Sequence, residues 1–211
     1  MSWSQVVHDL DEARTALAEP GDALDLRARS RLDSDWSDLG FVELVPGELV
    51  RPLDVPLSDL AATRALGARL GAALRPGDLV ILSGPLGAGK TSLAQGLGAA
   101  LGVSGAVTSP TFVLARAHRG PLPLLHVDAY RLRDAAAGDA TLLDDLDLDE
   151  GLEQGVVAVE WGEGLVEALT HERLHVELRR PEDETDGTPG GRVARVVPYG
   201  QRWSIVLPQY S

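Results

Sequence analysis

Cysteine is absent from this 211-residue sequence, and aromatic residues make up only 4% of it. Without cysteine the chain has no disulfides, no thiolate metal ligands and no thiol nucleophile, so catalysis must use oxygen, nitrogen or a metal ion. The core must rest on Leu, Val and Ala. No stretch approaches the ~20 consecutive apolar residues of a membrane span, and the N-terminus lacks the pattern of a signal peptide. We therefore expect a cytoplasmic protein with no membrane contact.

Lysine is almost as rare, because Lys90 is the only lysine among 19 basic residues and all the others are arginine. A chain that otherwise uses arginine for positive charge, yet keeps one lysine, indicates a role that a guanidinium group fills poorly. A compact ammonium group that reaches between phosphate oxygens is such a role. Acidic residues number 32, which gives a formal net charge of −13. Direct nucleic acid binding needs a basic surface, so we expect no DNA partner.

Residues 84–91 read Gly-Pro-Leu-Gly-Ala-Gly-Lys-Thr and fit the P-loop pattern Gly-x4-Gly-Lys-Thr. An apolar run precedes the motif and a helical spacing of leucines follows it, as the pattern requires. Glycines allow backbone N–H groups to turn toward phosphate oxygens, and the N-terminus of the helix adds partial positive charge. The motif predicts binding of ATP with Mg²⁺ by Gly84, Leu86, Gly87, Ala88, Gly89, Lys90, Thr91 and Ser92, with Lys90 on the phosphates and Thr91 on the metal.

The rest of the chain alternates apolar strands with amphipathic helices, which predicts an α/β fold: a P-loop NTPase-like sheet with flanking helices. Helices are expected after Pro56 and Ser58, over residues 92–101, and on the surface within residues 134–153. Strands are expected at residues 49–55, 78–83, 112–117, 122–127 and 156–159. The end of the chain alternates in the strand period and predicts a C-terminal antiparallel meander of residues 174–178, 192–197 and 203–207.

The acidic residues are concentrated near the N-terminus, where residues 1–50 contain eleven acids and four arginines. We predict an acidic N-terminal extension over residues 1–48, partly helical or disordered, and a P-loop ATPase domain over residues 49–211. The extension is either a loosely docked tail or an arm that binds a partner.

Two predicted strands end in an acidic residue, Asp128 in one case and Glu160 in the other. P-loop proteins need a carboxylate at the end of a neighbouring strand to hold Mg²⁺ directly or through water. We predict Asp128 as the metal-shell carboxylate and Glu160 as the second, which orders water or shares the metal. Residues 108–111, Thr-Ser-Pro-Thr, place hydroxyl groups before the next strand. They either approach the γ-phosphate or form a Ser-Pro turn that caps local backbone.

Together these segments resemble the TsaE family, the bacterial ATPases of tRNA threonylcarbamoyladenosine biosynthesis. The resemblance runs from about residue 50 to Trp203. Besides the P-loop, it rests on Ser-Pro-Thr-Phe at residues 109–112, His-Val-Asp-Ala-Tyr-Arg-Leu at residues 126–132 and Val-Glu-Trp-Gly-Glu at residues 159–163. Three residues depart from the family pattern: Pro85, Ser92 and Gly162. Pro85 also removes a backbone N–H from the loop.

The resemblance implies a P-loop ATPase that is weak alone and works with the TsaD and TsaB subunits of the threonylcarbamoyl transferase. It implies that the protein does not transfer the group itself and meets tRNA only indirectly. By the same resemblance, Thr111 is a switch-like hydroxyl that acts with Lys90 and Glu160, and Trp161 lies near the nucleotide.

Two other functions share the P-loop. A small-molecule kinase would need an arginine-rich lid, but the candidate arginines are scattered along the chain at Arg116, Arg119, Arg131 and Arg133. A protein that uses the nucleotide only as a structural clamp remains open. A GTPase is disfavoured because the Asn-Lys-x-Asp segment needs a second lysine.

Overall fold

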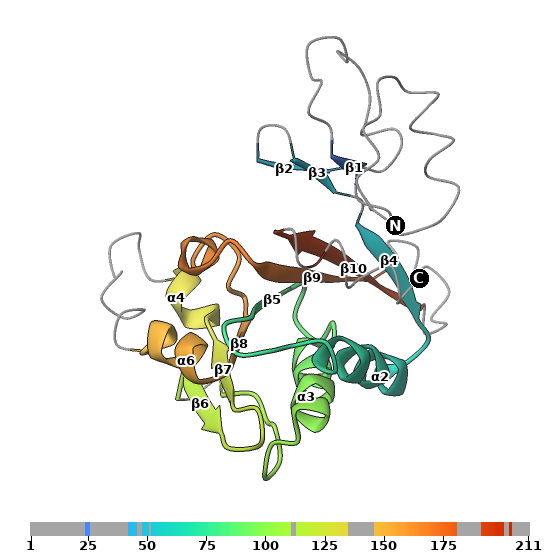
Figure 1. The fold of residues 1–211 in the computed structure, drawn as a ribbon. Helices are drawn as coiled ribbons and strands as arrows, with labels where there is room; N and C mark the ends of the chain where they lie inside the picture. The colour runs from blue at the N-terminus through green and yellow to red at the C-terminus, as the bar shows by residue number, and fades with distance from the viewer. Residues whose placement is uncertain are drawn as a thin grey trace, which may run out of the picture.

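The computed structural model describes residues 24–25, 42–45, 48–50, 52–110, 113–134, 146–180, 191–200 and 203. The helical part of the predicted N-terminal extension, expected within residues 1–20, and the candidate Thr111 lie outside these residues. Before β4 in the sequence, three short strands form a small antiparallel sheet in the order β1-β3-β2 (Figure 1). Its strands are β1 (Leu24–Asp25), β2 (Val42–Val45) and β3 (Glu48–Val50). The sequence pattern there is irregular and indicated no strand before residue 49.

A seven-stranded mixed sheet forms the centre of the protein, in the order β4-β10-β9-β5-β8-β7-β6 (Figure 1). Its four inner parallel strands are β9 (Arg173–Arg179), β5 (Leu79–Ser83), β8 (Val156–Glu160) and β7 (Leu124–Asp128). Antiparallel strands complete both edges: β4 (Leu53–Leu57) and β10 (Arg192–Tyr199) at one, β6 (Ala115–His118) at the other. This architecture confirms the predicted α/β P-loop-like fold.

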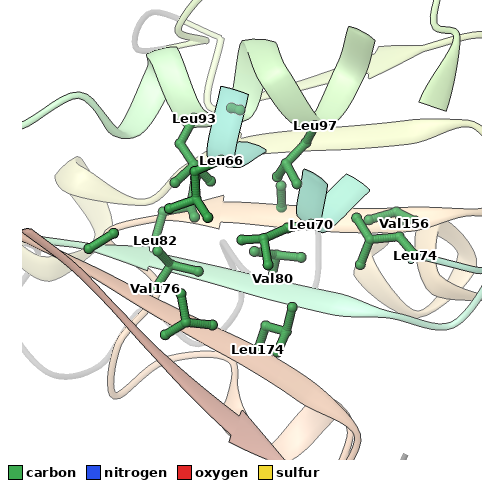
Figure 2. Close-up of a cluster of buried hydrophobic side chains, with 14 of the residues drawn as sticks. Leu66, Leu70, Leu74, Val80, Leu82, Leu93, Leu97, Val156, Leu174 and Val176 are labelled. Carbon is green, nitrogen blue, oxygen red and sulfur yellow. The ribbon is translucent and has the colours of Figure 1, made fainter. Parts of the chain in front are cut away.

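Helices cover both faces of this sheet. On one face lie α2 (Leu60–Gly71) and α3 (Lys90–Leu101), and on the other α4 (Tyr130–Asp134), α6 (Leu148–Gln154) and the short 3₁₀ helix η3 (Glu167–Leu169). Side chains alternate along a strand, so Val80 and Leu82 pack toward α2 and α3 while Leu79 and Ile81 pack toward the other face. Figure 2 shows Leu66 and Leu70 of α2 meeting Leu93 and Leu97 of α3 above the sheet. Burial on both faces explains the uninterrupted apolar runs of β5 and β8.

A single residue accounts for the start of α2, and another accounts for the end of α3. Helix α2 begins after Asp59, whose carboxylate accepts a hydrogen bond of 2.7 Å from the Ala62 amide. The predicted start at Pro56 and Ser58 was therefore too early, since Pro56 belongs to β4. Helix α3 ends at Leu101, where the helix predicted over residues 92–101 also ends, and Gly102 caps it with a φ of 69° in the left-handed region. Within the described part of the chain, no helix is both long enough and apolar enough to cross a membrane.

The C-terminal meander was predicted only in part. Strands β9 and β10 pair in antiparallel fashion, but β9 also pairs in parallel with β5 and is an inner strand of the main sheet. The outer partner of β10 is β4, with Leu53 opposite Val196. Trp203 is a buried helical residue, and residues 204–207 lie outside the described part of the chain. Strand periodicity identifies strands without identifying their partners.

Candidate functional site

The loop of residues 84–89 connects β5 to α3 and requires glycine at three positions. Gly84, Gly87 and Gly89 have φ values of 123°, 72° and 111°. These positive values favour glycine, because a glycine residue has no Cβ atom to clash with the backbone. The loop also passes tightly over the end of β9. A Cβ atom on Gly84 would lie 2.2 Å from the carbonyl oxygen of Leu178. The loop is thus held in its shape by its own backbone and by the neighbouring strand.

The first turn of α3 is suited to an anion. Gly89 occupies the N-cap position, and no side chain caps the helix there. The first amides of a helix have no partner within the helix, and their dipoles add up to a partial positive charge. A phosphate group placed at this point is stabilised by both effects.

Lys90 turns its ammonium group back over the loop. Its Nζ atom donates hydrogen bonds to the carbonyl oxygens of Gly84 (2.7 Å) and Pro85 (2.9 Å). The same atom lies 3.6 Å from the centroid of the Trp161 ring. Burial lowers the pKa of Lys90, and the carboxylates of Glu160 and Asp128 oppose this shift. The lone lysine of the chain therefore lies inside the candidate phosphate site.

The two predicted carboxylates are neighbours, since Asp128 and Glu160 pair in register at the ends of β7 and β8. Both are at least 95% buried. The Oε1 atom of Glu160 accepts a hydrogen bond of 2.8 Å from the Thr91 hydroxyl and lies 2.9 Å from Nε2 of His126. Glu160 thus joins the end of β8 to the first turn of α3, where the predicted metal-binding hydroxyl lies.

Asp128 is held by hydrogen bonds to two other segments of the chain. Its Oδ2 atom accepts a hydrogen bond of 3.0 Å from the Ser109 hydroxyl, and its Oδ1 atom accepts one of 3.2 Å from the Tyr130 amide. Ser109 belongs to the hydroxyl-rich loop of residues 108–111, so this loop contacts the acidic pair. Its backbone is also turned locally, because the carbonyl oxygen of Pro110 accepts from the Val113 amide at 2.8 Å.

The donor set suits Mg²⁺ bound together with phosphate oxygens. Thr91 offers a hydroxyl oxygen, and Asp128 and Glu160 offer carboxylate oxygens, all of which are ligands that Mg²⁺ takes. Across the described ranges, no three His, Cys, Asp or Glu residues gather as a metal cage. A magnesium ion that keeps water and substrate phosphates as ligands does not need one.

Two contacts of the site were not predicted. His126 lies on an apolar strand, where a hydrogen-bonded structural histidine is expected, but its partner Glu160 was not predicted. The available signal was its place two residues before Asp128, because residues i and i+2 share one face of a strand. Arg180, directly after β9, donates a hydrogen bond of 2.9 Å from Nη2 to the carbonyl oxygen of Gly87. No sequence signal indicated this contact, since β9 had been assigned to a separate meander.

The departures from the family pattern have structural counterparts. The carbonyl oxygen of Pro85 accepts hydrogen bonds from Lys90 and from the Ala88 amide, so this residue stabilises the loop through its acceptor. A Cβ atom on Gly162 would lie 2.7 Å from Cγ1 of Val159. Glycine at this position therefore allows the chain to pack closely after β8.

A comparison with protein families identifies the family of this chain. A family model described as threonylcarbamoyl adenosine biosynthesis protein TsaE matches residues 57–188. The chain belongs to the TsaE family. The matched segment begins at the last residue of β4 and contains the P-loop, the acidic pair and Trp161. This result confirms the resemblance seen in the sequence and associates the protein with the biosynthesis of threonylcarbamoyladenosine in tRNA.

Individual TsaE relatives agree with this assignment. The tRNA threonylcarbamoyladenosine biosynthesis protein TsaE of Streptomyces coelicolor is 53% identical over 145 residues, which cover 67% of this chain and 93% of that protein. The protein of the same name from Bacillus subtilis is 40% identical over 151 residues, covering 71% and 87%. A crystal structure of Bacillus subtilis YdiB is similar in fold, with a TM-score of 0.58 and 29% identity, and covers 75% of this chain and 93% of that chain.

Proposed function

We propose that this protein binds ATP with Mg²⁺ and hydrolyses it as a component of the tRNA N6-threonylcarbamoyladenosine (t6A) modification machinery. In this proposal it acts with the TsaD and TsaB subunits of the transferase and does not transfer the threonylcarbamoyl group itself. The observation that carries the proposal is the junction of Lys90, Thr91 and Glu160 at one end of the parallel strands, directly at the P-loop.

The phosphates are bound by the loop amides and by Lys90. The ammonium group exchanges its contacts with the carbonyl oxygens of Gly84 and Pro85 for contacts with phosphate oxygens. This exchange is favourable because a phosphate carries full negative charge, whereas a carbonyl carries only a dipole. Gly87, Gly89 and the first turn of α3 supply N–H groups at fixed positions.

Magnesium, when bound, neutralises charge on the phosphates and orients them for attack by water. Thr91 and the acidic pair are the residues that would hold it. The hydrogen bond between Thr91 and Glu160 favours Glu160, which we predicted as the second carboxylate, as the one nearer to the ion. Asp128 completes the pair, and its contact with Ser109 links the site to the loop that contains Thr111. In the proposal Glu160 also orders the attacking water, and Thr111 acts as the switch-like hydroxyl.

Dependence on protein partners is supported by the surface around the loop. Leu86 at the tip of the P-loop is 82% exposed, Val113 57% and Tyr130 48%. Large apolar side chains exposed beside a nucleotide site are suited to contact with another protein. The net charge of −13 argues against direct tRNA binding and favours contact through TsaD and TsaB.

ATP turnover measured with the TsaD and TsaB subunits present tests the proposal. We expect Lys90→Ala to lose ATP binding and Glu160→Gln to bind ATP but turn it over about 100-fold more slowly or worse, as for loss of a positioned base. Equal rates in the wild type and both variants would exclude catalysis at this site. ATP binding without turnover in the wild type would favour the structural clamp, and phosphate transfer to a small acceptor would favour a kinase.

A further inference from the structure

Arg180 touches the P-loop from the side of the site opposite to the carboxylates. Its Nη2 atom donates to the carbonyl oxygen of Gly87 at 2.9 Å, across 93 residues of sequence. Its side chain is exposed, and among the residues with described positions no carboxylate forms an ion pair with it. Its neighbour Arg179, in contrast, pairs with Glu177. The guanidinium group of Arg180 is therefore held at the loop and retains donors for a further contact.

The position of Arg180 is set by the end of β9. Strands β9 and β5 pair in parallel up to Ser83 opposite Glu177, immediately before the loop. The close approach of Gly84 to the carbonyl group of Leu178 continues this contact one step further. The contact between Arg180 and Gly87 follows as the third in the series. A side chain anchored in this way has a defined place relative to any ligand of the loop.

The order of strands shows which parts of the chain lie on either side of the P-loop. Thr91 and Glu160 mark the end that receives the metal and the terminal phosphates, and Glu160 belongs to β8. Strand β9 lies on the other side of β5 from β8. If the terminal phosphate lies beside Glu160 and the phosphates follow the loop across the end of β5, the nucleoside lies toward the end of β9. Arg180 is the residue found there in contact with the loop.

We propose that Arg180 binds the nucleobase of the nucleotide by stacking its guanidinium plane on the adenine ring. This inference rests on the proposed function, because it deepens the description of the same ATP site. A guanidinium group is planar, always charged and weakly hydrated, and it stacks readily on aromatic faces. The hydrogen bond to Gly87 orients the group, so part of the entropy cost of ordering the side chain is met before ATP binds.

Titration calorimetry of the full chain with two ligands tests this assignment: Mg²⁺-ATP, and Mg²⁺-tripolyphosphate, which lacks the base and the ribose. We expect Arg180→Ala to weaken ATP binding by about 3- to 30-fold, the range for a cation stacked on a ring, and to leave tripolyphosphate binding unchanged. Arg179→Ala is the matched control, because it removes an arginine one position away that is paired with Glu177. It should bind both ligands as the wild type does.

A second measurement compares ATP with CTP, because a purine offers a larger stacking surface than a pyrimidine. The preference of the wild type for ATP should shrink in Arg180→Ala. An equal loss of ATP and tripolyphosphate binding would show that Arg180 contacts phosphates or braces the loop, and would overturn the proposal. Unchanged ATP affinity, or an unchanged ATP to CTP ratio, would overturn it as well while leaving the proposed function intact. A wild-type protein that binds no ATP would overturn both.

Discussion

The ammonium group of Lys90 lies 3.6 Å from the centre of the Trp161 ring, at a distance where a cation is attracted to the face of an indole. Trp161 has a φ of 62°, a left-handed conformation that is uncommon for a residue with a bulky side chain. Its ring also lies 5.4 Å from that of Tyr130. The backbone after β8 therefore adopts an unfavourable conformation that places an indole over the ammonium group of Lys90.

Trp161 should report nucleotide binding through its fluorescence. If Lys90 exchanges loop carbonyls for phosphate oxygens, the charge next to the indole moves and its emission changes. We expect Mg²⁺-ATP to change the tryptophan emission with a midpoint equal to the calorimetric dissociation constant. Trp161→Phe should lose the change in emission and still bind ATP. The emission of Trp203, which is buried in the core, remains as an internal reference. A full signal in Trp161→Phe would contradict this contact.

His126 is predicted to position Glu160. His126 is fully buried, and it shares the Oε1 atom of Glu160 with the Thr91 hydroxyl. We expect His126→Ala to lower kcat about 10- to 100-fold with little change in KM, since a hydrogen bond to a charged group is lost. His126→Gln, whose amide can replace the Nε2 donor, should recover much of the rate.

The control for this experiment is His118→Ala, which removes a second buried histidine whose ring lies 6.5 Å from that of His126. His118 has no contact with Glu160 within the described residues. If the alanine variants at both positions lose the same activity, or if glutamine fails to rescue, general damage to the core explains the loss better than positioning.

The packing of α2 against α3 depends on glycine. A Cβ atom on Gly96 would lie 2.1 Å from the carbonyl oxygen of Arg64, and one on Gly67 would lie 2.2 Å from that of Leu93. Neither backbone can yield without moving its helix, so Gly96→Ala should lower the free energy of unfolding by about 1–3 kcal/mol. Urea denaturation measures this loss. Gly191→Ala is the control, because its nearest neighbour would be 3.7 Å away, and it should change stability little.

Acid should destabilise the protein partly through His175. Burial lowers the pKa of His175 below its usual 6.5, and the surrounding carboxylates offset this only in part. The unfolded chain then takes up a proton at a pH where the native state does not, so stability falls as the pH drops from about 6.5 toward the native pKa. His175→Gln should reduce this dependence in urea denaturation between pH 7.5 and 5.5. His171→Gln, at an exposed position, should keep the wild-type slope, and equal slopes in all three proteins would contradict the prediction.

The sequence alone determined the parts of the site that are local. The P-loop is one contiguous motif, and its positive φ angles are encoded by glycines at residues 84, 87 and 89. The buried strands are apparent as apolar runs because they are covered on both faces. The acidic residues at the ends of β7 and β8 were recognisable because such positions share one edge of a parallel sheet.

Tertiary structure decided which segments meet at that edge. The contact of Thr91 with Glu160 spans 69 residues, and that of Arg180 with Gly87 spans 93. Alternating hydrophobicity indicates which face of a strand is buried but not which strand lies beside it. The sequence therefore contains no local signal for the position of β9 beside β5 or for the pairing of β4 with β10. Because these pairings arise from the packing of the whole sheet, only the folded chain brings His126 to Glu160 and Arg180 to the loop.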